Sequence, residues 1–292
     1  MIEYLSPSSI SLWDMNQEKF YCQYLAKYPV PRMKQTLPMA IGSEFDRLVK
    51  NKIQKSIGVD IVDYSEQVDV SYRSEPLLHE GGEYLLSIYF PYVDKLLALG
   101  NPLFYDDGIF AYVNGCPLFG KPDFVIPNKL ILDWKVNGFF SHASPKRGYV
   151  FLDGDTHYKT QLIMHPSGNL ISCHSIDSIN NLWGLQLCIY KWLVTSASAS
   201  ASEDICLGLD QLVCDSRNVN IDVPVPCKVR VAVYRGLISK KFSDTLFDRV
   251  GYIWDVINSD HIFRGMSKME SQNRCAILDE CGRGAIEMAD VL

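Results

Sequence analysis

Two aspartates and a lysine, Asp123, Asp133 and Lys135, lie in and beside short apolar runs and have the residue types of a site for a metal ion and water. Carboxylate oxygens are ligands that Mg²⁺ and Mn²⁺ prefer. A cation held by both carboxylates would lie within reach of the lysine ammonium, and it can polarise a phosphate and activate water. The chemistry indicated is metal-assisted hydrolysis of a phosphate ester.

Two predicted strands would bring the aspartates together. Residues 116–126 and 129–136 are β-like runs, and the Pro-Asn pair between them favours a turn. Pairing of the runs as a hairpin places Asp123 close to Asp133.

Alternation along the second strand sorts its side chains between two faces. Asp133 and Lys135 are two residues apart and point to the same face, while Trp134 points to the other. Such strings also occur in ordinary hairpins. The alternative is therefore that Asp133 and Lys135 are solvated residues on an exposed strand.

The composition describes a globular chain. Its 292 residues are 47% hydrophobic and 12% aromatic, which is enough for a substantial core. The net charge of −6 argues against a broadly basic nucleic-acid coat but permits a local positive groove. Nine cysteines without a Cys-x-x-Cys pair, no N-terminal signal peptide and no long apolar run predict a soluble cytoplasmic protein.

Further elements are predicted along the chain. Ser6 and Pro7 begin a helix that runs to about residue 26. Helical periodicity continues at 41–58, at 82–99 with a kink or break at Pro91, at 179–194 and at 242–256. Strands are expected at 103–113 and 229–234, an insertion or mobile loop at 137–177, and a Ser/Ala linker at 196–202.

Five short motifs in order resemble those of the PD-(D/E)XK nuclease superfamily, closest to its RecB-like exonuclease branch. The motifs are Leu5-Ser6-Pro7-Ser8-Ser9, Ile41-Gly42-Ser43 with Phe45-Asp46, Gly120 with Pro122-Asp123, Asp133-Trp134-Lys135, and Gln186 with Tyr190. The resemblance implies an α/β, restriction-endonuclease-like core with a central mixed β-sheet flanked by helices. One nuclease domain would span 1–292, with a helical part at 1–100, a catalytic core at about 101–258 and a tail at 259–292.

The resemblance also implies roles for the residues of the motifs. Asp123 and Asp133 would bind Mg²⁺ or Mn²⁺, with the backbone carbonyl of Trp134 as a further ligand. Lys135 would position or activate the attacking water. Gln186 and Tyr190 would support the site from a helix; the alternative is an ordinary pair on a helix surface.

Two positions depart from the pattern of the RecB-like branch. Asp46 stands where relatives often carry a metal-binding histidine; it can bind a hard cation, or it is only a surface charge. Relatives with an iron-sulfur cluster use four cysteines, whereas here Cys22, Cys275 and Cys281 form a partial set, so no cluster is expected.

DNA binding is assigned to the insertion. Lys146, Arg147 and Lys159 could contact phosphates, and Tyr149, like Tyr158 and Phe139, could stack on unpaired bases. The alternative is a solvated loop with ordinary charges.

The predicted function is a magnesium-dependent deoxyribonuclease that degrades DNA from its ends, in recombination, repair or DNA breakdown, and the chain resembles standalone bacteriophage enzymes of this kind. The partner would be DNA with linear or single-stranded ends, together with a recombination or replication protein. Two alternatives stay open: a structure-specific endonuclease or nickase, and a non-catalytic protein that binds DNA ends with the same fold. RNA is a less favoured substrate.

Overall fold

The structure is a computed structural model that describes residues 2–26, 29–30, 34–60, 67–137, 144–146, 149–151, 162–165, 170–172, 174–198, 204–214 and 228–259. The chain forms two compact units, each built from separate stretches of sequence. The first unit comprises Met1–Lys34, Ile109–Gly120 and Lys240–Leu292. The second comprises Gln35–Gly108 and Lys121–Ser239. The predicted helical part at 1–100 is thus divided between the two units.

The first unit combines three helices with a hairpin in its described part. The helices are α1 (Pro7–Met15), α2 (Gln17–Tyr24) and α7 (Lys240–Asn258), and the hairpin consists of β1 (Ile109–Val113) and β2 (Cys116–Gly120). Helix α7 packs on both strands of the hairpin. The predicted helix at 242–256 is therefore confirmed as α7.

The first predicted helix is two helices, so its expected run to residue 26 is wrong. Ser6 caps α1 as predicted, because its Oγ accepts the Ser9 N–H at 3.2 Å. Asn16 then takes an extended conformation and caps α2, with its side chain accepting the Lys19 N–H at 2.8 Å. An asparagine at this position ends one helix and starts the next because its side chain satisfies a free backbone donor.

The second unit is built on a five-stranded mixed sheet. Its strand order is β3 (Phe124–Ile126), β4 (Leu130–Asn137), β8 (Cys206–Cys214), β9 (Val229–Gly236) and β5 (Val150–Phe151). Strands β4 and β8 are parallel, and the other neighbours are antiparallel. The mixed α/β class predicted from the sequence is therefore confirmed.

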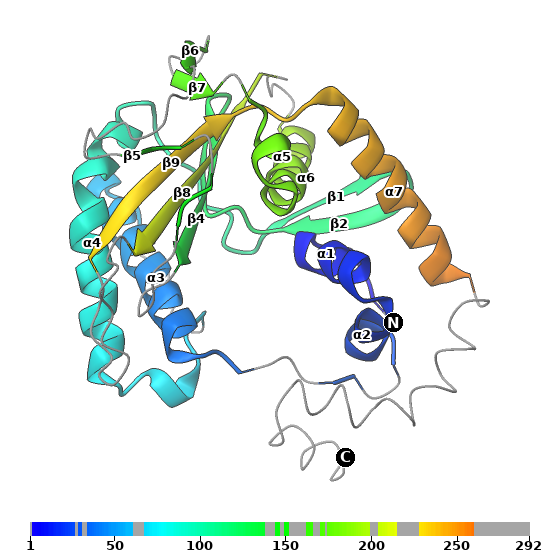
Figure 1. The fold of residues 1–292 in the computed structure, drawn as a ribbon, viewed down its shortest axis with the longest axis horizontal. Helices are drawn as coiled ribbons and strands as arrows, with labels where there is room; N and C mark the ends of the chain where they lie inside the picture. The colour runs from blue at the N-terminus through cyan, green and yellow to red at the C-terminus, as the bar shows by residue number, and fades with distance from the viewer. Residues whose placement is uncertain are drawn as a thin grey trace. The chain divides into compact units, whose positions relative to one another are not determined.

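Helices cover both faces of this sheet (Figure 1). Helices α3 (Leu37–Ile57) and α4 (Pro76–Leu97) pack together on one face, and α5 (Ile176–Ile179) and α6 (Asn181–Ala197) lie on the other. Burial of apolar side chains between sheet and helices drives this arrangement. A large buried cluster joins both helices of the first face to the sheet and includes Phe45, Ile53, Tyr89, Leu132 and Leu212.

Three helix predictions hold in this unit, with one change. The predicted helices at 41–58 and 179–194 correspond to α3 and α6. Helix α4 begins six residues earlier than expected and continues through Pro91 without a break. Within the predicted Ser/Ala linker, residues up to Ala197 still belong to α6, and residues 199–202 lie outside the described part.

The predicted strand at 116–126 is wrong because it divides after Gly120. Its first half, β2, pairs with β1 in the first unit, and its second half, β3, pairs with β4 in the second. A proline in the intervening Lys-Pro-Asp stretch has no N–H to donate to a ladder. In the predicted strand at 103–113, only Ile109–Val113 is a strand, although Leu103 forms a single bridge to Val125.

The predicted insertion contains strands in its described part, which corrects the expectation of a loop. Strand β5 pairs with the late strand β9, and β6 (Leu162–Met164) pairs with β7 (Leu170–Ser172) in a separate hairpin. Strand β8 was not predicted at all. A short 3-10 helix, η2 (Val70–Tyr72), lies before α4.

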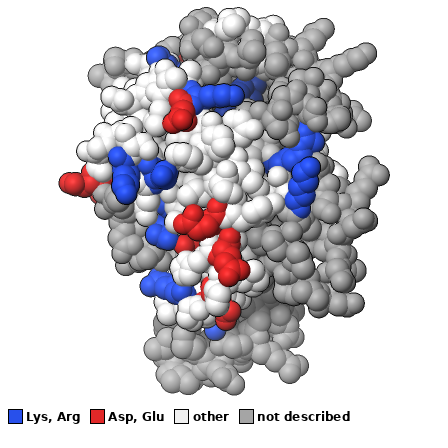
Figure 2. All heavy atoms as spheres, turned by 90° about the vertical axis from the view of Figure 1, so that its left-hand side faces the viewer, with Lys and Arg blue, Asp and Glu red and all other residues white. Residues whose placement is uncertain are grey.

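Charged residues are distributed over the face that carries α4 (Figure 2). Acidic and basic side chains of the described residues form separate small groups there rather than one continuous field. On α4 itself the exposed charges are Glu80, Glu83, Asp94 and Lys95. None of the helices in the described part is long and apolar enough to cross a membrane.

Two helical glycines of the second unit should respond in opposite ways to alanine. A Cβ on Gly184 would lie 2.7 Å from the Asp177 Cα, so Gly184→Ala must push α6 away from α5 and should cost about 1–3 kcal/mol of unfolding free energy. A Cβ on Gly42 would meet Val136 at an ordinary 3.5 Å, so Gly42→Ala should be neutral or stabilising by up to about 1 kcal/mol. Urea denaturation of both variants measures the difference; equal effects would show that α5 and α6 do not pack this closely.

Candidate active site

The predicted hairpin between the two aspartates is present. Strands β3 and β4 are antiparallel, with Phe124 paired to Leu132 and Ile126 to Leu130. Asn128 in the connecting turn has a positive φ of 58°, a conformation that asparagine tolerates better than most residues. Since Phe124 lies opposite Leu132, the residues next to this pair, Asp123 and Asp133, face each other.

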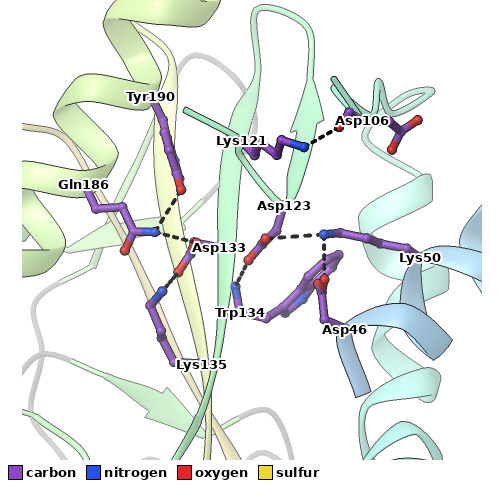
Figure 3. Close-up of polar contacts among 10 residues, drawn as sticks. All are labelled: Asp46, Lys50, Asp106, Lys121, Asp123, Asp133, Trp134, Lys135, Gln186 and Tyr190. Atoms are coloured by element: carbon purple, nitrogen blue, oxygen red, sulfur yellow. Dashed lines mark hydrogen bonds and ion pairs between the residues drawn. The ribbon is translucent and has the colours of Figure 1, made fainter. Parts of the chain in front are cut away.

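Asp123 is held by the backbone of the neighbouring strand. Its Oδ2 accepts the backbone N–H of Trp134 at 3.0 Å (Figure 3). Its Oδ1 lies 3.4 Å from the Nζ of Lys50. One oxygen of the side chain is thus held by the backbone of β4, while the other faces the ammonium group of Lys50.

Asp133 is buried at the centre of the site, with 1% of the residue exposed. Its Oδ1 accepts a hydrogen bond from Gln186 Nε2 at 3.0 Å, and its Oδ2 forms an ion pair with Lys135 Nζ at 2.5 Å. The alternative of a solvated surface aspartate is therefore excluded for Asp133. Lys135 projects from the same face of β4, as alternation predicts, and is about one third exposed.

Gln186 and Tyr190 reach the site from α6. They are one turn apart, and the amide of Gln186 donates to the Tyr190 Oη at 3.0 Å as well as to Asp133. Tyr190 is 7% exposed, so the two residues are not an ordinary surface pair. Burial and the Asp133 carboxylate raise the pKa of Tyr190, which keeps its phenol protonated.

Lys50 is a site residue that the sequence analysis missed. It lies on α3 one turn after Asp46, and its Nζ is 2.7 Å from Asp46 Oδ2. The available signal was the i, i+4 spacing of an acid and a lysine on a predicted helix, which by itself indicates only an intrahelical pair. Asp46 does reach the site, but in this structure its carboxylate is paired with Lys50, and its role as a metal ligand stays a prediction.

A second polar network, also missed, lies on the opposite face of β4. Trp134 Nε1 donates to the Tyr89 Oη at 2.8 Å, and this hydroxyl donates to Asp210 Oδ2 at 2.5 Å. Arg235 completes the network with hydrogen bonds of 2.6 and 3.2 Å to the two oxygens of Asp210. The backbone N–H of Trp134 donates to Asp123. By holding the indole of Trp134, this network therefore helps to fix the backbone that positions Asp123.

Burial and charge together determine how the site ionises. Burial raises the pKa of Asp46 to about 7 and that of Asp133 to about 8. Burial acts in the same direction on Asp123, but the ammonium groups of Lys50 and Lys135 outweigh it and lower its pKa. Burial would lower the pKa of Lys135, yet the Asp133 and Asp123 carboxylates raise it, so Lys135 stays cationic at neutral pH.

The donor atoms fit a hard divalent cation. Mg²⁺ is usually bound through one or two carboxylates and completed by waters and substrate phosphates, and Asp123 and Asp133 provide such a pair. Asp46 adds a buried Oδ1 that has no hydrogen-bond partner. Among the described residues, no group of three or more His, Cys, Asp or Glu side chains is arranged to hold a metal by itself. The arrangement thus suits an ion that substrate and water help to hold.

The residues predicted to bind DNA are not gathered into one site in the described part of the structure. Lys146 is exposed, and its backbone oxygen accepts a hydrogen bond from the Tyr234 hydroxyl at 3.1 Å. Tyr149 is 5% exposed, with its ring centroid 6.1 Å from that of Tyr234, so the expectation that it is free to stack on bases is wrong. Arg147 and Lys159 lie outside the described residues.

The other aromatic and cysteine predictions are mostly beyond the described part. Phe139 and Tyr158, like Cys275 and Cys281, lie outside the described residues. Cys22 is a buried free cysteine. The expectation that no iron-sulfur cluster forms therefore stays a prediction.

The raised pKa values of Asp46 and Asp133 predict how metal-free stability depends on pH. Between about pH 4 and pH 8 the folded protein retains protons that the unfolded chain has released, so these groups make stability fall as pH rises. The melting temperature in EDTA should therefore decrease from about pH 6 to about pH 8.5. A divalent cation favours the ionised carboxylates and should raise the melting temperature more at the higher pH.

Asp133→Asn provides the matched control for this measurement. Its amide cannot ionise, so the variant should show a flatter pH dependence in EDTA and a smaller response to the cation. Thermal unfolding followed by circular dichroism measures both. Equal slopes for wild type and Asp133→Asn would contradict the assignment of a raised pKa to this residue.

Comparison with known proteins gives little beyond this geometry. No protein family model matches the chain, and no curated protein matches it in sequence. Among solved structures it is similar to the crystal structure of a protein from Eubacterium rectale named "Putative exonuclease". The two are 12% identical with a TM-score of 0.47, over 87% of this chain and 80% of that chain. At this level of similarity, function has to be inferred from the side chains described above.

Proposed function

We propose that the protein is a metal-dependent deoxyribonuclease of the PD-(D/E)XK type, with a restriction-endonuclease-like core in its second unit. The observation that carries the proposal is the pairing of Asp123 and Asp133 across adjacent strands, with Lys135 on the same face and 2.5 Å from Asp133. The five ordered sequence motifs support the same family. A structural ion pair alone would not require two facing carboxylates in a largely buried position.

Asp123 and Asp133 would hold the cation, with the Trp134 carbonyl as a further ligand. Mg²⁺ or Mn²⁺ bound there would stabilise negative charge on the phosphate oxygens and make the attacking water more acidic. The Trp134 N–H keeps Asp123 in place, and Gln186 keeps Asp133 in place. Both carboxylates are thereby held ready before substrate binds, which favours catalysis because less reorganisation is needed.

Lys135 would orient the attacking water and neutralise charge on the phosphate. Its ammonium is cationic at neutral pH and sits beside the carboxylate pair, where a donated hydrogen bond can fix a water molecule. Tyr190 is protonated, so its hydroxyl can donate to the same water or to a phosphate oxygen. Gln186 links this phenol to Asp133 and therefore couples the helix α6 to the centre.

DNA ends are the proposed substrate. The chain carries no sequence motif of a recognition helix or zinc finger, which favours action on ends over reading of base edges. Contacts to phosphates from Lys146, Arg147 and Lys159 would supply most of the affinity and make it dependent on salt.

The test is a time course in Mg²⁺ or Mn²⁺ on three DNAs: end-labelled linear duplex, single strands and covalently closed circles. An exonuclease shortens the linear DNAs progressively from their ends and spares the circles. Cleavage of the circles would replace the exonuclease assignment with an endonuclease or nickase. Binding of DNA ends without cleavage in either metal would contradict nuclease activity.

A further inference from the structure

We infer that the Lys50 ammonium takes the place of a second metal ion, so that the centre binds a single divalent cation between Asp123 and Asp133. This rests on the proposed metal centre and goes beyond it, because it specifies how many ions the centre holds and which residue limits that number.

The position of Lys50 carries the inference. Its Nζ lies between two carboxylates, 2.7 Å from Asp46 Oδ2 and 3.4 Å from Asp123 Oδ1, and the side chain is only 9% exposed (Figure 3). The other oxygen of Asp123 accepts the Trp134 N–H. The ammonium of Lys50 therefore fills the space between Asp46 and the oxygen of Asp123 that the backbone does not hold.

The two lysines approach the carboxylates from different sides. Lys135 pairs with Asp133, whereas Lys50 pairs with Asp46 and Asp123. Three carboxylates thus face two ammonium groups, and one divalent ion is enough to reverse the net charge of the cluster. A second divalent ion beside both lysines would leave a large excess of positive charge in a largely buried space, which is strongly unfavourable.

The consequence concerns Asp46. Its Oδ2 serves as the counterion of Lys50 and holds the ammonium beside Asp123, whereas its Oδ1 has no hydrogen-bond partner. The pairing is built into α3, because the two residues are one turn apart on this helix. Removal of the ammonium would free an oxygen of Asp46 and an oxygen of Asp123, and both would then be available to a second ion.

Counting bound Mn²⁺ tests this inference without reference to activity. The intact chain is titrated with Mn²⁺, and free Mn²⁺ is measured by its electron paramagnetic resonance signal. Wild type should bind one ion per chain, and Lys50→Met, which keeps the length of the side chain but not its charge, should bind two. The two ions of Lys50→Met should also broaden each other's resonance by dipolar coupling.

Two control variants separate charge from fold. Lys50→Arg keeps the positive charge and should bind one ion. Lys55→Met removes an exposed lysine from the same helix and should also bind one. If Lys50→Met does not fold, as judged by circular dichroism, the counts for wild type and Lys50→Arg decide the question, because a second ion in either overturns the inference.

The outcomes distinguish this inference from the proposed function. Two ions in wild type, or one ion in folded Lys50→Met, would overturn the inference while leaving the metal centre in place, provided that Asp123→Asn loses the bound ion. No bound Mn²⁺ in wild type would instead remove the metal centre itself, and the inference with it.

Discussion

Lys135→Ala should lose DNA hydrolysis by about 10²–10⁴-fold while it still binds DNA ends. The substitution removes the ammonium group that lies 2.5 Å from Asp133, and with it the proposed donor to the attacking water. The carboxylates and the phosphate-binding residues are unchanged, so substrate affinity should change little. Single-turnover cleavage of end-labelled duplex, together with a binding titration in Ca²⁺, measures the two effects separately.

Lys129→Ala is the matched control for charge. It removes an exposed lysine from the same hairpin, whose ammonium donates to the backbone oxygen of Leu99. Its cleavage rate should stay within a few fold of wild type. A similar loss of rate in Lys129→Ala, or full activity in Lys135→Ala, would show that Lys135 does not act at the reacting phosphate.

Asp210→Ala should reduce the unfolding free energy by about 3–5 kcal/mol. Asp210 is 1% exposed and accepts two hydrogen bonds from Arg235, so its removal leaves a largely buried guanidinium group without the carboxylate that balances its charge. Tyr89 loses the acceptor of its hydroxyl at the same time. Urea denaturation followed by tryptophan fluorescence gives the change in free energy.

Two further variants test the reason for this loss. The double variant Asp210→Leu/Arg235→Met removes both charges and should be less destabilised than Asp210→Ala, because no buried charge is left alone. Asp244→Ala breaks an exposed pair with Lys240 and should cost less than about 1 kcal/mol. A loss in Asp210→Ala as small as that of Asp244→Ala would mean that the buried network contributes little to stability.

The centre of the site could be predicted because its geometry is local. Asp123, Asp133 and Lys135 lie on two strands joined by a tight turn, so alternation and hairpin pairing alone bring them together. Gln186 and Tyr190 could be placed on a common helix face by their spacing. That this face meets Asp133 is a tertiary fact, which only the resemblance to a nuclease family anticipated.

Lys50 and the Asp210 network could not be found in this way. Lys50 belongs to the site because it contacts Asp123, a residue 73 positions away in the sequence. The Tyr89 hydroxyl donates to Asp210, which is 121 positions away. Strand β8, which carries Asp210, is buried along its described length, so it lacks the alternation that marks a half-exposed strand. Such contacts depend on the assembled sheet and helices rather than on any local pattern.

Tyr149 was wrongly expected to be exposed, because the composition of the surrounding segment suggested a loop. The surrounding Gly, Ser and Pro residues indicated a solvated insertion, but β5 joins the edge of the central sheet and Tyr149 packs beside Tyr234. A two-residue strand leaves almost no periodic signal. The DNA-binding surface proposed for this segment therefore rests on the charged residues and not on stacking by Tyr149.

The most direct test of the account compares wild type with Asp123→Asn/Asp133→Asn on end-labelled DNA in Mg²⁺. Both asparagines keep the size of the side chains but remove the negative charges that would hold the cation. Wild type should release labelled products in Mg²⁺ and none in EDTA, and the double variant should bind the DNA without cutting it. Cleavage by the double variant at the wild-type rate, or no cleavage by wild type in Mg²⁺ or Mn²⁺, would contradict the account.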